Sequence, residues 1–150
     1  MLILFFIFSL LILLSTIGYG LIVVKLLKFE KFEYNLGLVG ILGLFTLSII
    51  ASYTHLFFPH NYIHNLIIIL IGLLSLNLKS KKGIKDFKYI LIIFILLFIF
   101  ILIAKTNEDF GYYHLPNSMQ FSQQKLQFGL GNLSHGFKHI SSLFMIMSLN

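Results

Sequence analysis

Of the 150 residues in this chain, 58% are hydrophobic and only 11% are charged, and the mean hydropathy is +0.95. Soluble globular domains carry about 25% charged residues, so the composition excludes that class. The absence of cysteine excludes disulfides, thiolate metal sites and cysteine nucleophiles. The net charge of +6 comes from lysines that lie mostly in two short clusters between apolar runs. This pattern is typical of cytoplasmic loops, and it excludes nucleic acid as the expected partner.

The first apolar run, LILFFIFSLLILLSTIGYGLIVV, covers about residues 2–24. It has neither the basic n-region nor the small-residue cleavage site of a secretory signal. We therefore predict a retained transmembrane helix, followed by the basic loop KLLKFEKFE.

Three further apolar runs follow, at about residues 36–57, 62–78 and 89–104. Pro59 separates the first two of these, because a proline disfavours helical geometry at the preceding residue. Uncharged runs of this kind are the signature of bilayer-spanning helices. The sequence therefore predicts an all-α, multi-pass membrane protein with four transmembrane helices in residues 1–104.

Lysine counts predict the orientation of these helices. The loop at 79–88 holds five lysines and the loop at 25–35 holds three, and alternating helices place both loops on one side. Lysine-rich loops stay in the cytoplasm, so the N-terminus and residues 105–139 are expected outside. All six histidines then lie on or near the outer side.

The outer loop, residues 105–139, contains a stretch that begins with Pro116, a residue suited to the first turn of a helix. At 100° per residue, four apolar side chains share one face: Leu115, Met119, Leu126 and Leu130. This pattern predicts a helix that lies in the membrane interface. The apolar run at 140–150 is too short to span a bilayer. It predicts the start of a further, truncated helix, and hence the N-terminal part of a larger protein.

The densest polar cluster, NEDFGYYHLP, directly follows the fourth apolar run. Its adjacent acids, Glu108 and Asp109, could bind a divalent cation such as Mg or Mn, or act as a general base. The alternative interpretation is that two carboxylates simply solvate a helix end at the interface.

Two histidine pairs have i,i+4 spacing: His60 with His64, and His135 with His139. Such pairs can face one metal ion on a helix, but they are also ordinary polar residues at interface depth. Neither pair encloses a glutamate, so the zinc-protease pattern is absent. A separate glycine triplet, at positions 37, 40 and 43, lies inside an apolar run and predicts close helix approach.

The segment from Asp109 to about Phe144 contains DFGYYHLP and then FGLGNLSHGFKHISSLF. It resembles the outer-loop signature of a family of large bacterial membrane proteins, roughly Asp-x-x-x-Tyr-His-Leu, then Gly-Leu-x-Asn and an Arg-Phe stretch ending in Ser. That family is similar in layout to the GT-C superfamily of integral-membrane glycosyltransferases. Those enzymes use polyprenyl-phosphate-linked sugars, and an acid in an early outer loop is catalytic or binds a divalent metal.

The resemblance implies a role for Asp109 as the loop acid, with Glu108 beside it. The matched positions are Tyr113 and His114 for the Tyr-His pair, Gly129, Leu130 and Asn132 for the Gly-Leu-x-Asn element, and Phe137, His139 and Ser141 for the closing stretch. Gly136 stands where the family has arginine, and Lys138 could meet a phosphate only as a point charge. Substrate contacts are thus expected from Tyr113, His114, Asn132, Lys138 and His139.

The expected function is therefore the N-terminal part of a glycosyltransferase for envelope glycan or polysaccharide assembly, in the bacterial cytoplasmic membrane. Its partners would be the lipid bilayer, a lipid-linked sugar donor and further helices, and the 150-residue piece alone is not expected to be active. Two alternatives stay open. One is a transporter or lipid-binding membrane protein, and the other is a small membrane subunit that acts by helix packing.

Overall fold

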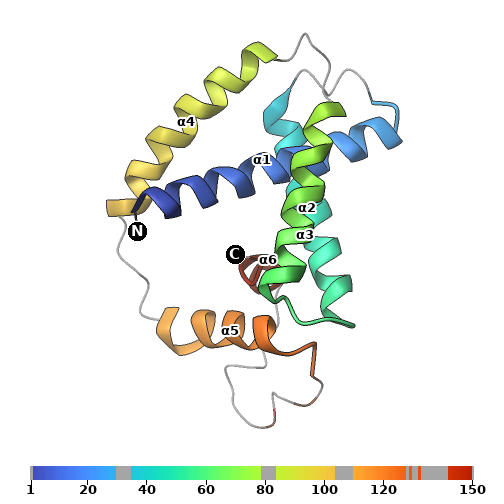
Figure 1. Ribbon diagram of the computed structural model, residues 1–150, viewed down its shortest axis with the longest axis vertical. Helices are drawn as coiled ribbons and strands as arrows, with labels where there is room; N and C mark the ends of the chain where they lie inside the picture. The colour runs from blue at the N-terminus through green and yellow to red at the C-terminus, as the bar shows by residue number, and fades with distance from the viewer. Residues whose placement is uncertain are drawn as a thin grey trace. The chain divides into compact units, whose positions relative to one another are not determined.

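The computed structural model describes residues 2–29, 35–78, 84–103, 110–127, 129, 132 and 142–149. Within these ranges the regular structure is entirely helical, so the all-α prediction is confirmed for the described part of the chain. The elements in Figure 1 are α1 (Leu2–Leu26), α2 (Leu36–His55), α3 (Tyr62–Ser75), the 3₁₀ turn η2 (Leu76–Leu78), α4 (Ile84–Ile103), the π-helical turn η4 (Phe110–His114), α5 (Leu115–Gln123) and α6 (Ser142–Met147).

Two of the described helices, α1 and α2, are long and apolar enough to cross a membrane. In each, only 28% of the most apolar stretch is buried within the structure, whereas the core helix of a soluble domain is mostly buried. Both helices begin at or near the predicted residues. That these helices and the predicted spans at α3 and α4 cross a membrane stays a prediction.

The chain divides into two compact units. The first contains residues 1–46 and 69–105, and the second contains residues 47–68 and 106–150. Both α2 and α3 contribute one end to each unit.

In the first unit, α1 approaches its neighbours so closely that backbone touches backbone at several glycines. A Cβ atom built on Gly18 would overlap the carbonyl of Gly72 in α3, and one built on Gly43 in α2 would overlap the carbonyl of Thr16. Small residues permit such close approach between apolar helices. The middle of α1 is accordingly buried, and Ile17, Leu21 and Val24 form a core with Leu36 and Val39 of α2.

The glycine prediction is right for Gly43 only. A Cβ on Gly40 would approach nothing closer than the Ile17 side chain at 4.0 Å, and one on Gly37 would meet only the nearby Asn35 side chain, at 3.3 Å. The close approaches instead involve Gly18, Gly20 and Gly72, which the spacing argument did not single out.

Aromatic rings join the start of α1 to the C-terminal half of α4 (Figure 1). The rings of Phe6 and Phe98 meet edge to face with centroids 4.9 Å apart, and Phe5 and Phe94 complete the group. Edge-to-face pairs are a favoured geometry for aromatic side chains.

Backbone caps set the ends of these helices. The N–H of Phe29 donates to the carbonyl of Val24, and Lys28, with φ 57°, donates to the carbonyl of Lys25. This is the Schellman arrangement, with Lys28 in the left-handed position that glycine usually fills. At the start of α2, the Asn35 side chain accepts from the N–H of Leu38, at 3.1 Å, which is a standard N-cap.

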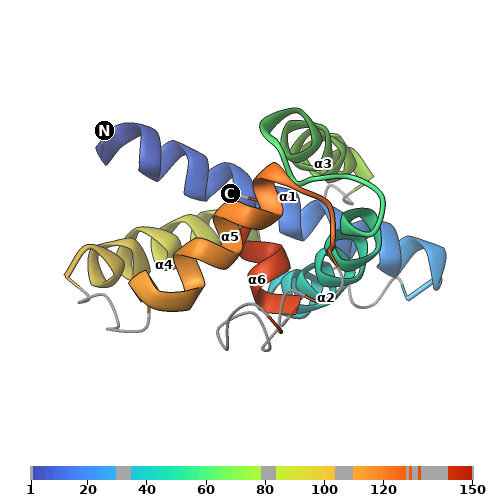
Figure 2. The same ribbon diagram turned by 90° about the horizontal axis from the view of Figure 1, so that it is seen from below.

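In the second unit, α5 begins with Pro116 in its first turn, as predicted, but it ends at Gln123. Its buried residues are Asn117 and Phe121, whereas Leu115 and Met119 from the predicted apolar face are 44% and 53% exposed. The predicted apolar face is therefore not the face that packs in this unit. The short helix α6 lies beside α5 (Figure 2), and the backbone turns at Ser148 directly after it.

Candidate functional site

Three histidines meet in the second unit, and we call His55, His60 and His64 the histidine cluster. His55 and His60 are fully buried, at 0% exposure, and their ring centroids lie 4.7 Å apart. His60 and His64 also have centroids 4.7 Å apart, with their ring planes only 6° from parallel. At the turn between α2 and α3, the His60 ring therefore lies between a parallel His64 ring, which is half-buried, and a His55 ring tilted by 57°.

The local sequence builds the turn that brings these rings together. Pro59 follows the irregular residues after α2, and Asn61 then caps α3. The side-chain oxygen of Asn61 accepts from the N–H of His64 at 3.0 Å, and the backbone carbonyl of Asn61 accepts from the N–H of Asn65. This N-cap fixes His64 in the first turn of α3, where its ring can lie against that of His60.

The last turn of α5 and the residues that follow it close one side of the cluster. The N–H of His60 donates to the carbonyl of Phe121 at 2.8 Å, and the N–H of Leu126 donates to the carbonyl of His55 at 2.9 Å. The Phe121 ring also lies on the His55 ring, with centroids 4.5 Å apart. Residues 121–126 are therefore held to the turn by two backbone hydrogen bonds and one ring contact.

The end of α6 closes the other side. Nδ1 of His60 lies 2.6 Å from Oγ of Ser148, and Nδ2 of Asn65 donates to the Ser148 carbonyl at 2.8 Å. The Ser148 hydroxyl itself donates to the carbonyl of Met145. Because that hydroxyl proton is already used, the geometry favours the His60 tautomer with its proton on Nδ1, donating to Ser148.

Several ring nitrogens in the cluster have no hydrogen-bond partner. Within the described residues, this holds for both ring nitrogens of His55 and for Nε2 of His64. Burial, followed by the neighbouring His55 and His64, lowers the pKa of His60 to about 4. His60 is thus neutral at physiological pH, and a proton placed on it would be poorly solvated.

The stacked geometry does not favour a shared metal ion. Parallel rings such as those of His60 and His64 present faces to each other, so their nitrogens do not converge on one point. In the part of the chain that the structure describes, no group of three acid or histidine side chains has the arrangement of a metal site. The second pair, His135 and His139, lies outside the described residues.

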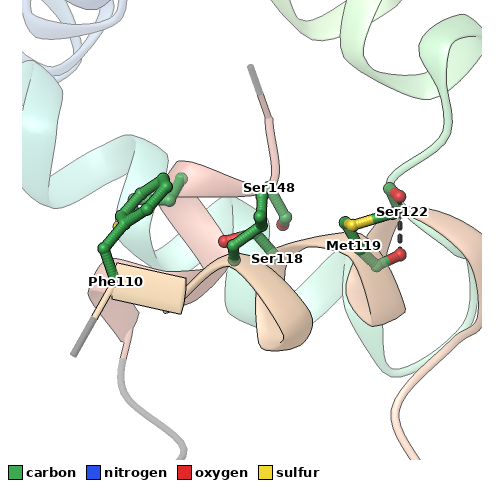
Figure 3. Close-up of a pocket in the computed structure, with 7 residues that line it drawn as sticks. Phe110, Ser118, Met119, Ser122 and Ser148 are labelled. Atoms are coloured by element: carbon green, nitrogen blue, oxygen red, sulfur yellow. Dashed lines mark hydrogen bonds between the residues drawn. The ribbon is translucent and has the colours of Figure 1, made fainter. Parts of the chain in front are cut away.

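A cavity of about 280 Å³ lies between α5 and α6, in the same unit. Its walls combine apolar side chains with three serines. The lining residues are Phe110, Leu115, Ser118, Met119, Ser122, Met147 and Ser148. In Figure 3, Ser118 and Ser148 lie in the middle of the lining, between Phe110 on one side and Met119 and Ser122 on the other. The Ser118 hydroxyl donates to the His114 carbonyl in η4, and the Ser122 hydroxyl donates to the Met119 carbonyl in α5. Their oxygens retain lone pairs that could accept a hydrogen bond from a ligand.

Most residues that the resemblance singled out fall outside the described part of the chain: Glu108, Asp109, Leu130, Phe137, Lys138, His139 and Ser141. Tyr113 and His114 belong to η4, the turn that leads into α5, and the His114 side chain is half-buried. Asn132 is exposed, and its N–H donates to the carbonyl of Gly129. The structure thus places His114 at the start of α5 and leaves the proposed loop acid untested.

Two residues of the site escaped the sequence argument. Ser148 stands 88 positions after His60, and no local spacing connects them. Phe121 lies on a different side of the helix from the predicted apolar face, and a large apolar residue there was the available signal, because Phe121 is the ring that packs on His55.

Comparison with known proteins gives one family. No curated protein and no solved structure matches the chain. The family model described as "Domain of unknown function (DUF8201)" matches residues 1–149. Because the match extends over nearly the entire chain, the protein belongs to the DUF8201 family.

Proposed function

We propose that this chain is part of a GT-C-like integral-membrane glycosyltransferase that uses a polyprenyl-phosphate-linked sugar for envelope glycan or polysaccharide assembly. In this proposal, four helices cross the bacterial cytoplasmic membrane, with residues 105–139 outside and the lysine-rich loops inside. Asp109 is the general base or the ligand of a divalent cation, Mg or Mn, and Glu108 assists it.

The observation that carries the proposal is the cavity between α5 and α6. One of its lining residues is Phe110, which directly follows Asp109 in the sequence. Its walls combine apolar side chains with serine hydroxyls, as a site for an isoprenoid chain with a polar head requires. A lipid-linked donor carries its phosphate and sugar at the membrane interface, so an acid next to such a cavity would lie near the bond to be broken.

The remaining matched residues take supporting roles in this proposal. Tyr113 and His114 are in the turn that leads into the cavity wall, and Asn132 is exposed and available to an acceptor sugar. Lys138 and His139 would meet the donor phosphate, with Lys138 as a point charge because arginine is missing from this stretch.

The test is sugar transfer in membranes that contain the protein as its gene encodes it. Asp109→Asn removes the charge and preserves the shape, and it should lower transfer by about 10²- to 10⁴-fold while the protein level in the membrane stays unchanged. Asp86→Asn is the matched control, because Asp86 lies in the first turn of α4, within the lysine-rich segment on the proposed cytoplasmic side. Full activity of the Asp109 variant would remove this acid from the mechanism.

A lipid-binding protein without chemistry is the second candidate, and the apolar lining of the cavity favours it as well. Met119→Trp would fill the cavity, and Met119 is exposed enough on α5 to be replaced without disturbing a core. In the transferase, this variant should lose transfer and photo-crosslinking to an isoprenoid phosphate together. In the lipid-binding protein, crosslinking would be lost and no transfer would exist in the unmodified chain.

A further inference from the structure

We propose that the histidine cluster is a pH-sensitive latch, which holds residues 121–126 and the end of α6 on the turn before α3 while its rings are neutral and releases them on protonation. The inference concerns a property of the second unit and is independent of the transferase proposal. It assigns a regulatory role to histidines for which no catalytic role has been argued.

The latch closes only over neutral rings. His55 and His60 are completely buried, and the backbone carbonyls beside them, that of Phe58 near His55 and those of Ala51 and Met145 near His60, are neutral acceptors that cannot balance a positive charge. His60 donates from Nδ1 to Ser148, and on protonation its Nε2 would become a second donor beside Thr54, at 3.4 Å. The Thr54 hydroxyl can donate to the Ala51 carbonyl, also at 3.4 Å, so a charged ring is only weakly supported.

The described groups that face His60 carry no negative charge. From α2 it is faced by His55 and from α3 by His64, each with its ring centroid 4.7 Å away. From α5 it is faced by Phe121, and from the turn after α6 by Ser148, neither of which is ionisable. The nearby Lys125 is exposed, and it would add positive charge. Among these described elements, no carboxylate faces His60 to stabilise the positive charge of a protonated ring.

The contacts around the histidine cluster also hold residues 121–126 and the end of α6 in place. Separating the rings to admit water would break the hydrogen bond from His60 to the Phe121 carbonyl and that from Leu126 to the His55 carbonyl. It would also break the contact between His60 and Ser148, which lines the cavity. Acidification would therefore free one wall of the cavity.

The direct test is hydrogen exchange, followed by NMR on the full chain in nanodiscs. The amides of His60 and Leu126 report the latch, and the amide of Leu21, buried in α1, reports the first unit. We expect the protection factors of His60 and Leu126, corrected for intrinsic exchange, to fall roughly fifty- to hundredfold between about pH 7.5 and about pH 4.5. The Leu21 amide should keep its protection factor.

The variant His60→Gln supplies the control, because glutamine can donate to Ser148 and cannot be protonated in this range. It should abolish the pH dependence at Leu126. An unchanged protection factor in the unmodified chain, or the same fall in the variant, would overturn the latch. If His60→Gln does not fold, ¹⁵N spectra of the imidazoles in the unmodified chain decide instead. Protonation of His60 must then coincide with the loss of protection at Leu126, and protonation with protection intact would refute the proposal.

Discussion

Nδ1 of His60 and Oγ of Ser148 lie 2.6 Å apart, although 88 positions separate the two residues in the sequence. Both side chains are at least 97% buried. A buried N–H that loses its acceptor cannot turn to water instead, so the contact matters more through its loss than through its formation.

Replacing Ser148 by alanine should therefore destabilise the second unit by about 1–3 kcal/mol. The reason is that the Nδ1–H of His60 would be left buried without an acceptor. Thermal unfolding in detergent measures the effect. Ser122→Ala is the matched control, because its hydroxyl also donates to a carbonyl three residues earlier but is exposed, and it should change the melting temperature little. Equal melting temperatures for the two variants would contradict the buried contact.

The stability of the second unit should fall as the pH is lowered from about 6.5 to about 4. The pKa of His60 is lowered to about 4 in the folded chain, so the unfolded chain binds more protons throughout this window. The lowered pKa of His60 therefore contributes roughly 3 kcal/mol to the free energy of unfolding. This contribution is fully present above the pKa of the unfolded chain and is lost progressively below it. Melting temperatures should converge with those of His60→Gln at low pH and separate at neutral pH. A constant difference between the two chains at all pH values would exclude His60 as the titrating group.

Two glycine-to-alanine substitutions should have opposite signs. Gly72→Ala places a Cβ against the backbone of Ser15 and should destabilise the packing of α1 on α3 by about 1–3 kcal/mol. Gly40→Ala meets only the Ile17 side chain at 4.0 Å and replaces a poor helix former by the best one, for a gain of up to about 1 kcal/mol. Unfolding in mixed micelles compares them. A neutral Gly72 variant would show that α1 and α3 are not in backbone contact.

Lys28→Gly should stabilise the end of α1 by about 0.5–1 kcal/mol. Lys28 has φ 57°, a conformation that costs a residue with a Cβ but not glycine. The opposite result is expected for Lys25→Gly, because Lys25 lies in the last turn of the helix and glycine weakens helices. Circular dichroism during thermal unfolding distinguishes the two variants. A loss of stability in both would place Lys28 outside the left-handed region.

Apolar runs were enough to predict where the helices lie. Each run predicted an element that the structure contains, because a chain segment in an apolar environment must satisfy its own backbone hydrogen bonds. The pairing of those helices was not predictable. Gly18 finds its partner Gly72 only when α1 and α3 are brought together, and the regular triplet at 37, 40 and 43 drew the prediction to α2 instead.

The predicted helix after Pro116 shows where periodicity was insufficient. The pattern selected Leu115 and Met119 as the apolar face, but α5 buries Asn117 and Phe121. The reason is the histidine cluster, which offers Phe121 a ring to pack against and His60 as a donor to its carbonyl. The spacing of His60 and His64 was visible in the sequence, whereas the position of Ser148 depends on the turn after α6. The proposed roles of Glu108, Asp109, Lys138 and His139 rest on resemblance alone.

The backbone contacts of α1 also bear on how sequences of this family can diverge. Where two helices touch through carbonyls and glycine Cα atoms, as at Gly18 and Gly72, every side chain larger than hydrogen is a steric clash. The outward positions of the same helices, such as Ile3 and Ile49, are about three-quarters and two-thirds exposed and can exchange freely among apolar residues. Relatives should therefore share few letters in these helices beyond small residues at the contact points, and an alignment built on overall identity would place the helices in the wrong register.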